Sequence, residues 1–346
     1  MMTRRLFTAT ALSLAALLTP FAAASASKSP APKITAFIPV AAVPDNPVST
    51  ASYVYVASIR PSVLSVIDAR THHVATTLTI PSGSFASVIS PALSTIYVAS
   101  TNDVTVVSPL SNRVTASLHL PRVTALAILS NGDAAALYAN GAGLAVINSA
   151  GSLISHRSLK IRASYLAASS AVYTLSFRSP KNPVLSSYSP ALAPSAVTTV
   201  ARGASGLVAT PLGVFVLNVP AQRVEELSVA LRAATTIKVK DPQFVTTSGQ
   251  RVYIASSKVL YEYTSSQLVA SSPLKAPLIS MLFDGAYLLT TSFEPEAAFC
   301  TYNVASLKAL SRLTLALATG DATLVPGSNL VYVSNHAGLV SDITIN

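Results

Sequence analysis

Paired carboxylates come closest to a chemical pattern in this chain. Glu294 and Glu296 are separated by one residue, and in a strand-like segment residues i and i+2 point the same way. Two converging carboxylates can hold Ca²⁺ or perform acid–base chemistry. Pro295 lies between them, so a solvated turn is the alternative. Asn102 and Asp103 could add oxygen ligands from elsewhere, but no calcium-loop motif occurs, so we predict no cofactor, with Ca²⁺ as the alternative.

Basic and imidazole side chains give two further candidates. Arg178 and Lys181 lie in one short segment that could receive an anion, a solvated charge cluster being the alternative reading. The five histidines include no pair with metal-site spacing such as H-x-x-x-H, so we predict no metal site. His336 is the candidate for a ligand or catalytic role, whereas adjacent His72 and His73 are predicted to be exposed turn residues.

The segments that resemble motifs for a catalytic nucleophile or for phosphate binding are incomplete or lack the helix that those motifs need. The segment 203–206, GASG, lacks the last glycine of G-x-S-x-G and the strand-to-helix elbow which that motif needs. Gly141 and Gly143 begin a dinucleotide-like pattern between two strands, where no helix N-terminus is available, so they are better explained as turn residues. The single cysteine, Cys300, is interpreted as a buried strand residue, with a reactive thiol as the alternative. We therefore predict no catalytic residue.

The elements that position these side chains are β-strands. Thr95–Ala99, Val104–Ser108 and Val114–Leu120 are apolar runs separated by short polar turns, and they are rich in Val, Ile, Thr and Tyr. Copies recur about every 40 residues, a period typical of a propeller blade with four antiparallel strands. Each copy is marked by an aromatic residue in its first visible strand: Tyr55, Tyr97, Tyr138, Tyr173, Phe215, Tyr253, Tyr287 and Tyr332.

The two ends of the chain complement each other. Lys33–Pro39, KITAFIP, matches the last strand of other copies and has no strands before it in its own copy. Ala322–Asn346 supplies three strands and then stops. If the N-terminal strand completes the last blade, the ring closes and leaves no open terminal edge. The sequence predicts an all-β fold, a single propeller of eight blades, with seven as the alternative.

The repeats resemble the YVTN-type β-propeller repeats of exported bacterial and archaeal proteins. YVSN at Tyr332–Asn335 is the nearest match to the family tetrapeptide, and Leu64–Pro81 is similar to its strand, turn and following strand. The resemblance covers Lys33 to Asn346 and is weakest in the middle copies. It implies a propeller with a surface or periplasmic location, and it implies no single activity.

The N-terminal segment reads as an export signal. Residues 1–26 contain Arg4 and Arg5, an apolar stretch of ten residues at 9–18, and a small-residue cleavage site at 24–26. A general secretory signal is favoured, and a twin-arginine signal is the alternative. We expect residues 27–32 to be a disordered Ser/Pro/Lys spacer and residues 33–346 to form the propeller. No transmembrane segment is expected after the signal is removed, which predicts a periplasmic or extracellular, cell-surface protein.

Composition favours an exported β-protein over a nucleic-acid-binding one. Hydrophobic residues make up 51% and charged residues 10% of the chain, and the net charge is +10. The 23 Lys and Arg form no run, and no RNA-binding aromatic signature or zinc module accompanies them, so we expect no nucleic-acid partner. Tryptophan is absent, which excludes the Trp-Asp signature of the WD40 class.

These patterns predict a non-catalytic binding or interaction module of the cell envelope. We expect it to be a monomer and to bind a protein, a glycan or another envelope component. The predicted ligand-binding rim consists of the loops that join the second and third strands of the blades, together with the links between blades. Its candidate residues are Asn102, Asp103, Arg178, Lys181, Glu294, Glu296 and His336. The alternative is a propeller enzyme, a lactone hydrolase, metal-dependent lyase or quinoprotein-like dehydrogenase, with its site at the channel mouth. Concentration-dependent assembly would indicate a structural coat or adhesive role instead.

Overall fold

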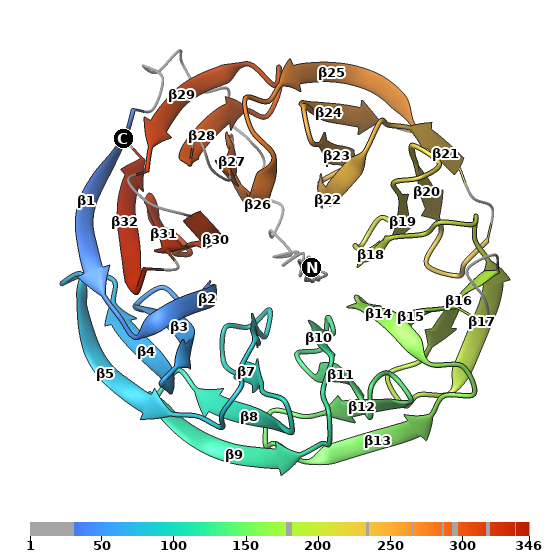
Figure 1. The fold of residues 1–346 in the computed structure, drawn as a ribbon, viewed down its shortest axis with the longest axis horizontal. Coiled ribbons are helices and arrows are strands. Elements are labelled where there is room, and N and C mark those ends of the chain that lie inside the picture. The colour runs from blue at the N-terminus through green and yellow to red at the C-terminus, as the bar shows by residue number, and fades with distance from the viewer. Residues whose placement is uncertain are drawn as a thin grey trace, which may run out of the picture.

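The computed structural model forms a ring of four-stranded antiparallel sheets around one central axis (Figure 1). It describes residues 31–177, 182–232, 235–264, 266–285, 287–292, 297–315, 319–335 and 337–345, without the side chain of residue 284. The described residues make eight sheets, so the predicted eight-bladed propeller is confirmed and the seven-bladed alternative is wrong. They include no helix with the length and hydropathy needed to cross a membrane.

The strands run from the axis outward in each blade. Blades 1 to 4 are β2 (Ala42–Ser49), β3 (Tyr53–Arg60), β4 (Ser62–Asp68), β5 (His73–Thr79); β6 (Ala86–Ile89), β7 (Ile96–Ala99), β8 (Asp103–Ser108), β9 (Arg113–His119); β10 (Ala125–Ile128), β11 (Ala134–Tyr138), β12 (Gly143–Ile147), β13 (Leu153–Ser158); and β14 (Ala163–Ala168), β15 (Val172–Phe177), β16 (Pro183–Tyr188), β17 (Pro194–Thr199).

Blades 5 to 8 are β18 (Gly206–Ala209), β19 (Val214–Asn218), β20 (Arg223–Leu227), β21 (Thr235–Lys238); β22 (Pro242–Ser248), β23 (Arg251–Ser256), β24 (Val259–Thr264), β25 (Gln267–Pro273); β26 (Leu278–Asp284), β27 (Tyr287–Ser292), β28 (Ala298–Asn303), β29 (Ala309–Thr314); and β30 (Thr319–Leu324), β31 (Leu330–Asn335), β32 (Leu339–Ile345), β1 (Pro32–Pro39). Blade 8 therefore takes its outer strand from the N-terminal part of the chain.

Strand β1 closes the ring as the sequence predicts. It pairs antiparallel with β32 from Pro32 opposite Ile345 to Pro39 opposite Leu339, and so begins one residue before the predicted Lys33. Ile38 points into the core at 2% exposure, while its neighbour Phe37 is 51% exposed. This alternation is the period of a strand with one buried face, and it sets the register of the closing pair.

Apolar contacts between neighbouring blades form the core. The buried side chains fall into eight clusters, and each cluster joins two adjacent blades. Six of the predicted aromatic markers are fully buried at equivalent places on the second strands: Tyr55, Tyr97, Tyr173, Phe215, Tyr253 and Tyr332. The blades hold together because most residues of their second strands are buried between neighbouring blades.

The markers chosen in blades 3 and 7 are out of register with the rest. In blades 1 and 6 the third strand has a β-bulge in its pairing with the outer strand. The marker of the second strand pairs with the residue just before that bulge: Tyr55 with Val66, and Tyr253 with Glu262. By the same criterion the equivalent residues are Ala135 in blade 3 and Leu289 in blade 7. Tyr138 and Tyr287 lie at strand ends and are only partly buried, which explains the uneven spacing in the sequence.

The turns between third and outer strands pack against the preceding blade. In seven blades this turn contains a residue with positive φ: His72, Asn112, Gly151, Leu192, Leu231, Ser266 and Leu307. Several marker tyrosines donate to carbonyl groups in the next blade's turn, as Tyr173 does to Val229 (3.0 Å) and Tyr253 does to Val304 (3.3 Å). These turns are therefore part of the blade-to-blade packing.

His72 is a correction to the sequence prediction. Its turn is where the sequence placed it, but the Nδ1 atom of His72 lies 2.5 Å from Asp342 Oδ2 and 3.2 Å from the hydroxyl of Tyr332, both in blade 8. The left-handed backbone at this residue turns the side chain toward the preceding blade, which a continuous strand through the pair would not do. His73 is exposed, as predicted.

Candidate functional site

Five predicted rim residues lie outside the described residues. These are Arg178, Lys181, Glu294, Glu296 and His336. The structure therefore places only Asn102 and Asp103 of the candidate set, both at the loop between β7 and β8. This loop lies on the face of the ring that also carries the links between blades, which we call the link face.

Asn102 and Asp103 stabilise a link between blades 2 and 3. The side-chain oxygen of Asn102 accepts a hydrogen bond from the backbone N–H of Arg122 (3.2 Å), and its carbonyl accepts one from Leu120 (2.8 Å). Asp103 Oδ1 lies 3.4 Å from the Nδ1 atom of exposed His119. Both residues thus make local contacts within and next to this link. The described residues contain no group of three or more His, Cys, Asp or Glu that could hold a metal ion.

A carboxyl pair that sequence reasoning missed lies at the innermost strands. Asp45 is in β2 of blade 1, and Asp321 is in β30 of blade 8, where the side chains share a hydrogen bond. Burial and the adjacent Asp45 carboxyl raise the pKa of Asp321 to about 7, because two carboxylates at this separation cannot both be charged without cost. The signal available was ring closure itself, which brings the first and last blades side by side.

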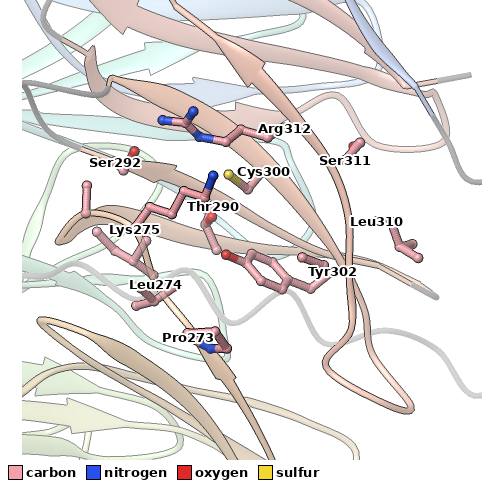
Figure 2. A pocket seen from close by; sticks show the side chains of 13 residues that line it. Pro273, Leu274, Lys275, Thr290, Ser292, Cys300, Tyr302, Leu310, Ser311 and Arg312 are labelled. Atoms are coloured by element: carbon pink, nitrogen blue, oxygen red, sulfur yellow. The ribbon is translucent and has the colours of Figure 1, made fainter.

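A pocket on the link face lies between blades 6 and 7 (Figure 2). It has a cavity volume of about 290 Å³, and its walls come from the link after β25, the start of β26 and the strands β27, β28 and β29. One wall is apolar and includes Leu274, Ala276 and Leu278, which bury their side chains against the two blades. The small size suits a ligand, or a protruding group of a larger partner, of a few heavy atoms.

The rest of the pocket lining is polar and positively charged. Lys275 is exposed, and its side chain extends toward Cys300, with Arg312 beyond (Figure 2). Thr290 and Tyr302 lie below them, and both are nearly inaccessible to solvent. A cation pair over buried hydroxyl groups is an arrangement that receives a negatively charged or hydroxyl-rich group.

Cys300 is held as a thiol in this pocket. Burial raises the pKa of Cys300, and Arg312, Tyr302 and Lys275 act in the opposite direction by hydrogen bonding or charge. Burial likewise raises the pKa of Tyr302, whose hydroxyl interacts with Cys300 and Thr290. Since a nucleophilic cysteine needs a lowered pKa, the environment favours a binding wall over a catalytic thiol. Cys300 is a strand residue as predicted, but it is only partly buried because it faces the cavity.

Sequence reasoning missed Lys275 and Arg312 for different reasons. Lys275 lies in a link between blades, where a single lysine forms no motif that would mark a site. Arg312 lies in the outer strand β29, where alternation predicts a solvated side chain. Only the packing of blade 6 against blade 7 brings the two together.

Comparisons with known proteins show the fold and nothing finer. No protein-family model matches the chain, and no curated protein matches it in sequence. The similar solved structures include BamB from Moraxella catarrhalis, with 10% identity, a TM-score of 0.65 and coverage of 91% of this chain and 100% of that one. Dihydro-heme d1 dehydrogenase NirN in complex with DHE has 12% identity, a TM-score of 0.68 and coverage of 86% and 74%.

Other similar structures differ widely in origin. The computationally designed Ika8 protein has 12% identity, a TM-score of 0.65 and coverage of 89% and 99%, and hydrazine synthase of Kuenenia stuttgartiensis has 13%, 0.58, and 88% and 96%. A designed protein and enzymes share this architecture, so likeness at such low identity selects no activity. The chain is thus a β-propeller by its fold, and its resemblance to the YVTN-type repeats stays a prediction.

Proposed function

We propose that this protein is an exported, non-catalytic β-propeller that binds a component of the cell envelope through the pocket between blades 6 and 7. The observation that carries the proposal is the pocket's mixed lining, in which apolar residues lie beside Lys275, Arg312 and buried hydroxyl groups. The signal-like N-terminal segment and the resemblance to YVTN-type repeats support export.

The chemistry of the pocket favours an acidic group on the bound partner. Lys275 and Arg312 provide fixed positive charge, and the hydroxyl groups of Thr290 and Tyr302 lie close to Cys300 beneath them. A carboxylate on a short apolar or sugar framework suits this lining. Its charge would pair with the two cations, and its carbon atoms would pack against Leu274 and Leu278. Proteins and glycans of the envelope both offer such groups.

The test uses Cys300 as a reporter, since the chain contains no other cysteine. Mature protein is reacted with iodoacetamide at pH 8.5, with and without solubilised envelope fractions and a panel of small carboxylates, and the labelled mass is followed over time. We expect the matching fraction to slow labelling of Cys300 at least about fivefold. An intact-mass spectrum of the same preparation, beginning at Ser27, checks the predicted signal cleavage.

A matched pair of variants separates the pocket from general charge effects. Lys275→Met is expected to remove the protection, whereas Lys160→Met should leave it unchanged, because Lys160 is an exposed residue of the equivalent link between blades 3 and 4. Equal protection in both variants, or no protection by any fraction, would contradict a ligand site at this pocket.

An enzyme is the second candidate, and the Asp45–Asp321 pair is the observation that favours it. A carboxyl pair that shares a proton near neutral pH has the property a general acid–base needs. NirN shows that a protein of similar fold can be a dehydrogenase. Turnover of a lactone or polyol panel that disappears in Asp45→Asn and persists in Lys275→Met would favour this candidate over the binding module.

A further inference from the structure

The interface between blade 8 and blade 1 differs from the other blade interfaces in how it is closed. Here the first and last described strands meet, and β30, β31 and β32 are joined to blade 1 through the hydrogen-bonded pairing of β1 with β32. We call this interface the closing junction. Its neutral contacts include Ser49 Oγ with Thr323 Oγ1 (3.0 Å) and with the carbonyl of Leu324 (2.7 Å).

The first titratable contact across the closing junction is made by His72 and Asp342. Asp342 is fully buried on β32, its Oδ2 lies 2.5 Å from His72 Nδ1, and its Oδ1 has no hydrogen-bond partner among the described residues. The hydroxyl of Tyr332 lies 3.2 Å from the same His72 nitrogen. The contact therefore joins an imidazole nitrogen of blade 1 to a buried carboxyl group of blade 8.

Equivalent positions in other blades carry no such charge pair. At the blade 1–2 interface the turn residue is Asn112, whose Oδ1 accepts from the hydroxyl of Tyr55. At the blade 5–6 interface the turn residue is Ser266, which donates to Glu226 (3.3 Å). Glu262 occupies the same place in blade 6, but its partner Arg251 belongs to its own blade and is always charged. The described interfaces thus place a protonatable turn residue against a buried acid at the closing junction.

The second titratable contact is the Asp45–Asp321 pair on the innermost strands of the same two blades. Two ionised carboxylates repel, whereas one proton shared between them makes a hydrogen bond. Burial and Asp45 raise the pKa of Asp321 to about 7, and burial raises the pKa of Asp342 even though His72 acts against it. In both contacts, therefore, a carboxyl group keeps its proton to a higher pH than an ordinary carboxyl group does.

Few other ionisable groups face these contacts. Asp68, at the end of β4, and Asp342 both act on the buried hydroxyl of Tyr332 and raise its pKa. Arg70 lies in the same turn, where it helps to lower the pKa of Asp68, and His73 beside it is exposed. From the strands packed against Asp321, the described charged partner is Asp45.

We propose that the closing junction is a proton-operated latch, which holds blade 8 against blade 1 in acid and loosens at neutral to alkaline pH. The sign follows from linkage. The folded-state affinity of Asp321 and Asp342 for protons exceeds that of an ordinary carboxyl, so the stabilisation is complete below about pH 4 and is lost as pH rises toward 7. This proposal does not depend on the pocket or on any ligand.

Hydrogen exchange of the mature protein, followed by mass spectrometry from pH 5 to 8, tests the latch. Each amide rate is divided by its intrinsic rate, so that the remaining change reports opening. If opening releases one proton, protection of peptides from β1, β2 and β30–β32 falls up to about tenfold per pH unit, while β14–β21 on the opposite side of the ring (Figure 1) changes less. An equal change around the ring would overturn the proposal.

Two variants remove the switch without removing the contacts. Asp321→Asn places a permanent donor where the shared proton lies, and Asp342→Asn places a neutral amide of the same size opposite His72. Each is expected to flatten the pH dependence of protection at the closing junction. Glu226→Gln, the equivalent acid of blade 5, is the control and should retain it. If both variants keep the wild-type profile, the latch is wrong, and if one fails to fold, the other decides.

Discussion

At the residue scale, the turns between third and outer strands differ in the side chain that the residue with positive φ presents to the preceding blade. Leu192, Leu231 and Leu307 are buried there, Asn112 accepts a hydrogen bond from Tyr55, and His72 meets Asp342. A backbone with positive φ is unusual for leucine, so its recurrence shows that burial of the side chain outweighs the local strain. One turn geometry thus carries apolar, neutral polar and ionic contacts.

Glycine is required at one loop of the link face. Gly141 has a φ of +81°, and a Cβ there would run into the carbonyl of Ala163 in the next blade. Gly141→Ala is expected to lower the free energy of unfolding by about 3 kcal/mol or more, because conformation and contact both oppose it. Gly249→Ala, at φ +56° with nothing near the added carbon, should cost only about 1 kcal/mol. Urea unfolding of the two variants checks this, and equal costs would contradict the steric argument.

At the scale of elements, the closing strand β1 carries more of the fold than its position in the sequence suggests. It is the first strand of the described residues, and its eight residues complete blade 8 and cover the edge of β32. The outer strands of the blades are exposed and rich in Ser and Thr, as in β5 and β17. Hydroxyl-bearing side chains at these edges keep the strands soluble while few charges are used.

A pair of substitutions in β1 measures this contribution. Ile38→Ala removes a side chain buried at the closing junction and is expected to lower the free energy of unfolding by about 2–4 kcal/mol. Phe37→Ala, one residue earlier on the exposed face, should change it by less than about 1 kcal/mol. Chemical denaturation gives both values. Similar losses would mean that β1 contributes through its backbone pairing rather than through its buried face.

At the scale of the whole molecule, the buried carboxyl groups set the pH at which the ring is most stable. Burial raises the pKa of Asp321, Asp342 and Glu262, and His72 and Arg251 only partly offset this for the last two. Backbone N–H groups lower the pKa of Asp68, which acts in the opposite direction but lies at the surface. The raised groups stabilise the fold below about pH 4, and this stabilisation is lost as the pH rises.

The thermal midpoint should therefore fall as the pH rises from 5 to 8, by at least about 3 °C, because three raised groups outweigh one lowered group. Differential scanning calorimetry in matched ionic strength measures it. Glu262→Gln removes one contributor far from the closing junction, so its midpoint should fall less steeply. A midpoint that rises toward pH 8 would show that the surface carboxylates dominate.

The fold could be predicted because it repeats. A period near 40 residues and a terminal strand without partners specify a closed ring, and small errors in one copy, such as choosing Tyr138 in place of Ala135, do not alter the count. The candidate site could be predicted only in part. The rim was inferred from topology, but Asn102 and Asp103 stabilise a link, and the pocket residues Lys275 and Arg312 were not among its candidates.

The sequence by itself determined the strands, the number of blades and the closure by β1, because these follow from local alternation and from a period that any copy reveals. Only the tertiary structure decided which side chains meet. Asp45 meets Asp321, and His72 meets Asp342, across almost the full length of the chain, and Lys275 approaches Cys300 from the link between blades 6 and 7. Such contacts depend on the register of neighbouring blades and on single residues with positive φ, and no local pattern specifies either.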